Sequence, residues 1–87
     1  MDEKRTELRE ALERLHAELE QTRMVDPESR QLLQHLQGDI QTVLRRPSAA
    51  SRARLSARLD DALAQFEQSH PDLTLTIKQV LDNLARV

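Results

Sequence analysis

The sequence predicts an all-α fold, a small bundle of about four helices forming a single helical domain over residues 1–87. Apolar residues are 38% of the chain and recur at spacings of three and four, the period of one helix face. One glycine and one aromatic residue are too few for the turns and strands of a β-sheet protein. The chain contains no cysteine, so packing or self-association must stabilise it.

Three prolines divide the chain into helical segments, because proline is tolerated in the first turn of a helix but not in its interior. Pro27, Pro47 and Pro71 therefore mark the starts of the second, third and fourth helices. The expected helices cover about 3–23, 27–45, 52–68 and 70–85.

Short polar side chains next to these prolines are candidate helix caps. Asp26 is placed to cap the second helix, and either Ser48 or Ser51 can cap the third. Ser69, followed three residues later by Asp72, resembles a capping box for the fourth helix.

The first two helices carry apolar stripes of different width. The first stripe is narrow, like a coiled-coil seam, and the second is wider. Only residues 24–26 separate the two patterns, which predicts an antiparallel hairpin over 3–45 with the second helix as the partner of the first. The stripe residues are Leu8, Leu12, Leu15 and Leu19, then Leu32, Leu33, Leu36, Ile40, Val43 and Leu44.

A Ser/Ala/Arg linker over 46–51 precedes a second helix pair over 52–86. Arg52 occupies the stripe position one turn before Leu55, so the first turns of the third helix have nothing large to bury, and we expect them to be exposed or frayed. The stripes of this pair are Leu55, Leu59, Ala62, Leu63 and Phe66, then Leu73, Ile77, Val80, Leu81 and Leu84.

Charge is distributed unevenly along the chain. Residues 40–59 contain five arginines and no acid, whereas residues 1–39 contain ten acids against six bases. The arginines either pair with acids of the first helix or of a second chain, or they form a surface for an anionic partner such as nucleic acid. The arginines are Arg45, Arg46, Arg52, Arg54 and Arg58.

Two histidines are candidate metal ligands, but the residues around them do not complete a metal site. An antiparallel hairpin that turns near residue 25 places His16 level with His35, and Glu13 gives the Glu-x-x-His spacing of di-iron bundles. Glu20 and Asp39 lie one turn after each histidine. The residue three before His35 is apolar, however, and both histidines border solvent, so we expect no metal or other cofactor.

His70 and Gly38 can each be interpreted as structural or as functional residues. His70 precedes Pro71, which biases it away from helical geometry, and we expect it to close the corner between the last two helices rather than to act in catalysis. Gly38 is either a neutral surface glycine or a point where another helix approaches closely.

The helical pattern resembles the short bacterial proteins catalogued as domain of unknown function 4404. The resemblance is carried by the runs 8–20, 26–44 and 66–71, the last containing Phe66-Glu67-Gln68-Ser69-His70-Pro71, and by Leu81-Asp82-Asn83-Leu84. It implies a small, helical, cytoplasmic protein and no particular activity.

The sequence contains no phosphate-binding loop, nucleophile elbow or zinc-ligand pair, so we expect no enzyme. The leading hypothesis is a self-association or protein-interaction module, with a homodimer formed through the hairpin. The alternative is an accessory protein that binds nucleic acid through the Arg45–Arg58 segment; the pI of 5.9 and the lack of interleaved aromatics argue against it. A charged start and the absence of a long apolar run favour a cytoplasmic location without membrane contact.

Overall fold

The computed structural model describes residues 3–86, which form four α-helices and no strand. These are α1 (Glu3–Gln21), α2 (Pro27–Arg45), α3 (Ala49–Phe66) and α4 (Pro71–Arg86). The all-α prediction is confirmed. Over the described residues, no helix has a stretch that is long and apolar enough to cross a membrane.

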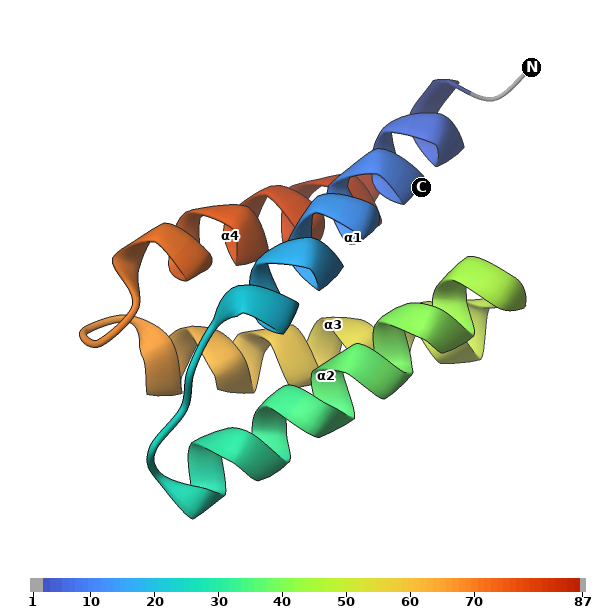
Figure 1. Ribbon diagram of the computed structural model, residues 1–87. Helices are drawn as coiled ribbons and strands as arrows, with labels where there is room; N and C mark the ends of the chain where they lie inside the picture. Colours follow the sequence, from blue (N-terminus) through green and yellow to red (C-terminus); the bar gives the residue numbers. More distant parts are fainter. Residues whose placement is uncertain (1–2, 87) are drawn as a thin grey trace.

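Successive helices run in opposite directions (Figure 1). The start of α1, the loop 46–48 and the end of α4 therefore lie together at what we call the terminal end of the bundle. The loops 22–26 and 67–70 lie at the opposite, loop end.

The main partner of α1 is α4 rather than α2. α1 packs most extensively on α4, α2 packs on α3, and α3 packs on α4, whereas the contact between α1 and α2 is the least extensive. The Thr76 hydroxyl of α4 donates to a Glu18 carboxylate oxygen of α1 at 2.7 Å, which adds a polar link to this pair. The expectation that α2 is the partner of the α1 stripe is therefore wrong, because the loop 22–26 is long enough for the two helices to splay apart (Figure 1).

The core follows the predicted stripes. The predicted residues outside the buried core, such as Leu32, Leu44 and Leu84, are half-buried against it. Ala11 is the one core residue that the stripes omit. The buried apolar residues are Leu8, Ala11, Leu12, Leu15, Leu19, Leu36, Ile40, Val43, Leu55, Leu59, Ala62, Phe66, Leu73, Ile77 and Val80.

Asp26 caps α2 as predicted. Its carboxylate accepts a hydrogen bond from the Ser29 backbone N–H at 3.1 Å, and Pro27 occupies the first turn. The helix covers the predicted range, because its cap and its proline agree.

α3 begins three residues earlier than expected, at Ala49, and the linker shortens to 46–48. Ser48 and Ser51 form a reciprocal capping box: each backbone N–H donates to the other's hydroxyl at 3.0 Å. The turn is helical and Ser51 is buried, so it does not fray, whereas Ala49, Ala50, Ala53 and Arg54 are exposed as expected. The hydrogen bonds stabilise a turn that has no large apolar side chain to bury.

His70 closes the corner between α3 and α4. Its ring packs edge-on against Phe66 with centroids 5.9 Å apart, and its carbonyl accepts from both the N–H and the hydroxyl of Thr74 at 3.0 Å. Because α4 begins at Pro71, Ser69 precedes the cap position and makes no side-chain hydrogen bond within residues 3–86, so the predicted Ser69 cap is wrong. α3 and α1 also end two residues early, at Phe66 and Gln21.

Candidate functional site

Four of the five predicted arginines gather at the terminal end. Arg45 and Arg46 end α2 and its loop, and Arg52 and Arg54 lie in the first turns of α3. Their side chains make no hydrogen bond or ion pair with any residue in the part of the chain that the structure describes. This group is therefore available to an outside partner.

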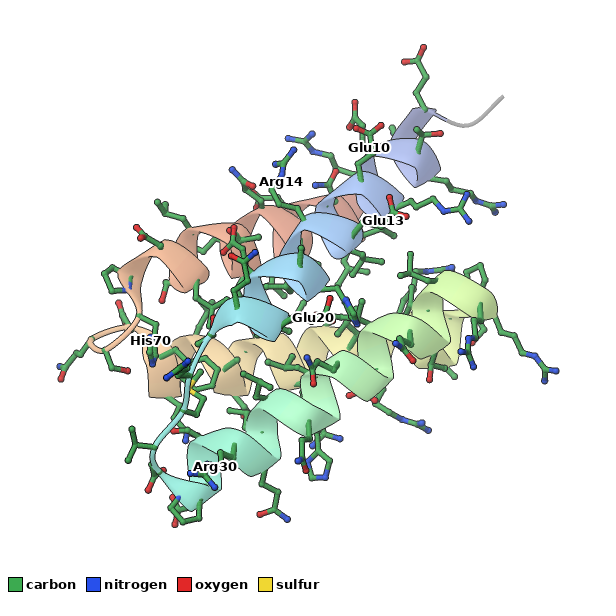
Figure 2. All side chains as sticks on the ribbon, viewed as in Figure 1. Glu10, Glu13, Arg14, Glu20, Arg30 and His70 are labelled. Atoms are coloured by element: carbon green, nitrogen blue, oxygen red, sulfur yellow. The ribbon has the colours of Figure 1, made fainter. Side chains whose placement is uncertain are left out.

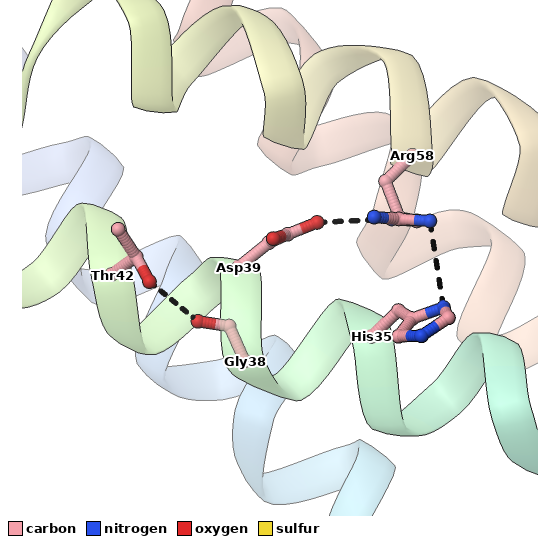
Figure 3. A network of polar contacts seen from close by, with 5 residues as sticks. All are labelled: His35, Gly38, Asp39, Thr42 and Arg58. Atoms are coloured by element: carbon pink, nitrogen blue, oxygen red, sulfur yellow. Dashed lines mark hydrogen bonds and ion pairs between the residues drawn. The ribbon is translucent and has the colours of Figure 1, made fainter.

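Arg58 is separate from that group. Its guanidinium Nε donates to Asp39 Oδ2 at 3.0 Å, and a second nitrogen donates to His35 Nδ1 at 3.5 Å (Figure 3). The Asp39 side chain is 15% exposed and that of Arg58 is 32% exposed. The prediction that arginines pair with acids of the first helix is wrong for Arg58, which joins α3 to α2.

Further bases join the four arginines at the terminal end, where the bases of residues 3–86 outnumber the acids of the same residues, Glu3, Glu7, Glu10 and Asp82. The bundle measures 41 × 20 × 20 Å, so its two ends are well separated. The additional bases at the terminal end are Lys4, Arg5, Arg9 and Arg86.

The loop end has the opposite charge. Its bases are Arg23 and Arg30, and they are outnumbered. The acids at this end are Glu18, Glu20, Asp26, Glu28, Glu67 and Asp72. The fold therefore turns a sequence with an acidic part at 1–39 and a basic part at 40–59 into a rod whose described residues give one basic and one acidic end.

A groove of about 250 Å³ opens at the terminal end between α1, the end of α2 and the start of α3. We call it the basic groove. Three arginines line it: Arg5 and Arg9, which are exposed, and Arg52, which is half-buried. The apolar residues that line it are Leu8, Leu12, Val43, Leu44 and Pro47.

The lining of the basic groove defines what it can bind. Among residues 3–86, its lining contains no histidine, no acid and no hydroxyl, hence no candidate nucleophile or general base from that part of the chain. Guanidinium groups bind carboxylates through paired hydrogen bonds, and the leucines offer an apolar floor. The groove suits an apolar side chain with carboxylates beside it.

A wider hollow of about 520 Å³ lies at the loop end, beside His70. Ser69, His70 and Asp72 all line it, but no hydrogen bond joins these three side chains among the described residues. Glu18, which also lines it, already accepts from Thr76. The hollow lacks the nucleophile–base contact of a catalytic site, and His70 has the corner role that we expected (Figure 2).

The two candidate metal-binding histidines do not meet. His16 contacts Glu20 on its own helix at 3.2 Å and Gln41 on α2 at 3.4 Å, whereas His35 contacts Arg58. The predicted pairing of His16 with His35 is wrong, since α1 lies opposite a part of α2 six residues further along. Over residues 3–86, no group of three His, Asp or Glu side chains gathers to hold a metal.

Gly38 lies on the surface of α2, exposed to solvent (Figure 3). A Cβ atom added to it meets no heavy atom within 4 Å. The surface interpretation is therefore confirmed, and the close approach of another helix is excluded for the described chain.

Sequence reasoning missed the α1 side of the basic groove. Arg5, Leu8, Arg9 and Leu12 are spaced i, i+3, i+4 and i+7, which places all four on one face of α1. A basic-and-apolar face at the start of α1 could have been recognised from that spacing. That this face borders the end of α2 required the fold.

The fold and the groove define a small four-helix bundle with an uncovered, basic, apolar-floored opening at one end. The family described as Domain of unknown function (DUF4404) matches residues 8–87, and the chain belongs to that family. No curated protein and no solved structure matches the chain.

Proposed function

We propose that this chain is a non-enzymatic self-association module of the cytoplasm that buries its basic groove against another protein chain. The observation that carries the proposal is the basic groove at the terminal end, where Leu44 is half-buried and Pro47 is exposed above a floor of the buried residues Leu8, Leu12 and Val43. In a well-packed domain of this size, neighbouring helices normally cover such side chains.

Binding of a partner chain at the basic groove gains free energy by displacing water from it. The groove of about 250 Å³ is open to water, and leucine and valine side chains offer that water no hydrogen bonds. A partner's apolar side chain that replaces those waters gains hydrophobic free energy, and the arginines fix its orientation through carboxylates. A small domain with one aromatic residue gains proportionally more from such burial.

Mass measurement by size-exclusion light scattering over a range of concentrations tests the proposal. We expect a dimer that dissociates on dilution. Leu44→Glu, which places a carboxylate in the groove, should give a monomer, whereas Leu63→Glu alters an equally half-buried leucine outside the groove and should keep the dimer. Circular dichroism checks that both variants remain helical. A wild-type monomer at high micromolar concentration contradicts self-association.

Nucleic-acid binding is the second candidate, favoured by the side chains of Arg45, Arg46, Arg52 and Arg54, which lack partners within residues 3–86. Four neutralised phosphates give a log–log salt slope of about −3 to −4. Fluorescence anisotropy with a labelled duplex, with and without Arg46→Glu and Arg54→Glu, measures it. We rank this candidate second because Phe66 is the chain's one aromatic and is buried, so it cannot stack on bases.

A further inference from the structure

The loop 22–26 presents an apolar side chain on a fixed support. Val25 is 87% exposed, the highest value among the large apolar residues described. Two contacts hold the backbone on either side of it: Arg30 Nε donates to the Met24 carbonyl at 2.8 Å, and Asp26 caps α2. A side chain that is held ready in this way loses little conformational entropy when it binds.

The charge around Val25 is complementary to the charge of the basic groove. Glu20, Asp26 and Glu28 are exposed near this loop and outnumber Arg23, the exposed cation within it, while Arg30 is engaged with the loop backbone. An apolar side chain flanked by carboxylates is the ligand that the groove suits. This same chain therefore carries both a groove and a matching projection.

The groove and the loop 22–26 both belong to the side of the bundle that α1 and α2 form. α1 and α2 contribute most of the groove at the terminal end, and the loop that joins these two helices carries Val25 at the loop end (Figure 1). Two copies placed antiparallel on this side bring each Val25 to the other's groove. Two-fold pairs of this kind are closed, because each copy uses both its projection and its groove.

Other arrangements of two copies are less favourable. Pairing of groove against groove brings Arg5, Arg9 and Arg52 of both copies together, and like charges at an interface repel. Pairing of Val25 against Val25 brings the acidic loop ends of the two copies together. Of these three pairings, the antiparallel one opposes unlike charges at both contacts, and unlike an open head-to-tail chain it leaves no groove or loop unused.

We propose that the occupant of the basic groove is a second copy of this chain, in an antiparallel dimer where each loop 22–26 seats Val25 in the partner's groove. This inference rests on the proposed self-association and adds the partner and the contact. It assigns the exposed valine a binding role and the groove arginines a role in orienting the partner's carboxylates.

A pair of matched variants tests the contact. Val25→Lys removes the apolar side chain and adds a charge that the groove repels; because Val25 is 87% exposed, we expect the variant to fold as wild type does. Leu75→Lys is the control, because Leu75 is the other exposed large apolar residue described, 62% exposed on α4. We expect Val25→Lys to weaken the dimer by at least about tenfold and Leu75→Lys to leave it within about twofold of wild type.

Disulfide trapping tests the geometry directly, since the chain has no cysteine. One copy carries Val25→Cys and the other carries Pro47→Cys, since Pro47 is an exposed residue of the groove. The two are mixed in oxidised glutathione, which accepts the two electrons released as the disulfide forms. A disulfide needs Cβ atoms about 3.5–4.5 Å apart, so linkage reports close contact. We expect a mixed linked dimer here and none when Leu75→Cys replaces Val25→Cys.

The outcomes separate the two proposals. A wild-type monomer overturns self-association as a whole. A wild-type dimer that Val25→Lys leaves intact, without the mixed disulfide, overturns the loop as occupant and leaves self-association standing. Rapid linkage of Val25→Cys to itself overturns the antiparallel arrangement in favour of tip-to-tip pairing.

Discussion

Replacing Leu59 by alanine should cost about 2 to 5 kcal/mol of the free energy of unfolding. Leu59 lies near the middle of α3, is 0% exposed and belongs to the core cluster of the four helices. Leu36 in α2 is buried to the same degree, and we expect the same loss for Leu36→Ala.

The expected loss of unfolding free energy in Leu59→Ala has two parts. Removing the equivalent of three buried carbon groups at about 0.8 kcal/mol each loses about 2.4 kcal/mol of transfer free energy. The cavity left behind adds about 24 cal/mol for each Å³ that the neighbours fail to fill. Total stability at about 0.05–0.15 kcal/mol per residue is about 4–13 kcal/mol for 87 residues, so either substitution removes a large share.

Urea unfolding followed by circular dichroism at 222 nm, at one fixed protein concentration, measures the loss as a lower midpoint. Leu75→Ala, on an exposed leucine, is the control and should shift the free energy by less than about 0.5 kcal/mol. If the Leu59→Ala midpoint equals that of wild type or of Leu75→Ala, the centre of this stripe is not core and the reasoning fails.

Three smaller changes can be checked by the same unfolding measurement. Gly38→Ala should stabilise the protein by about 0.5–1 kcal/mol, because alanine favours the helix and meets no neighbour; a lower midpoint contradicts the open space seen there. Ser48→Ala should cost about 1 kcal/mol through loss of the capping box with Ser51, and no loss means that this cap is unimportant. Asp39→Ala should cost about 1 kcal/mol in wild type but little in an Arg58→Met background, and equal losses in both contradict a coupled pair.

Local features of the sequence predicted the helices well. Asp26 and Pro27 fixed the start of α2, and the leucine spacing identified the buried face of each helix. These signals act within one or two turns, so the sequence contains everything needed to recognise them. The Ser69 cap failed for a related reason: the helix starts at Pro71, one residue later than expected, and the pattern alone cannot choose between adjacent starts.

Which helices pack together could not be predicted from the same signals. The narrow stripe of α1 fits α2 or α4 equally well by spacing, and a short connection favoured α2. The choice depends on contacts far apart in the sequence, such as Thr76 with Glu18 and Gln79 with Arg14. The mistaken pairing also placed His16 opposite His35, so the error in packing became an error about a candidate site.

The basic groove follows from a feature of the sequence for which we expected a different outcome. The turn before Leu55 offers no large apolar side chain, and we expected that turn to fray. The structure keeps it helical through Ser48 and Ser51, so the missing bulk remains as space against Leu8 and Val43 at the terminal end. At the loop end the same helix contributes Phe66, which is fully buried. A leucine in place of Ser51 would lose the hydroxyl that bonds Ser48, so the buried serine keeps the helix start, and Arg52 beside it is the α3 residue that faces the groove.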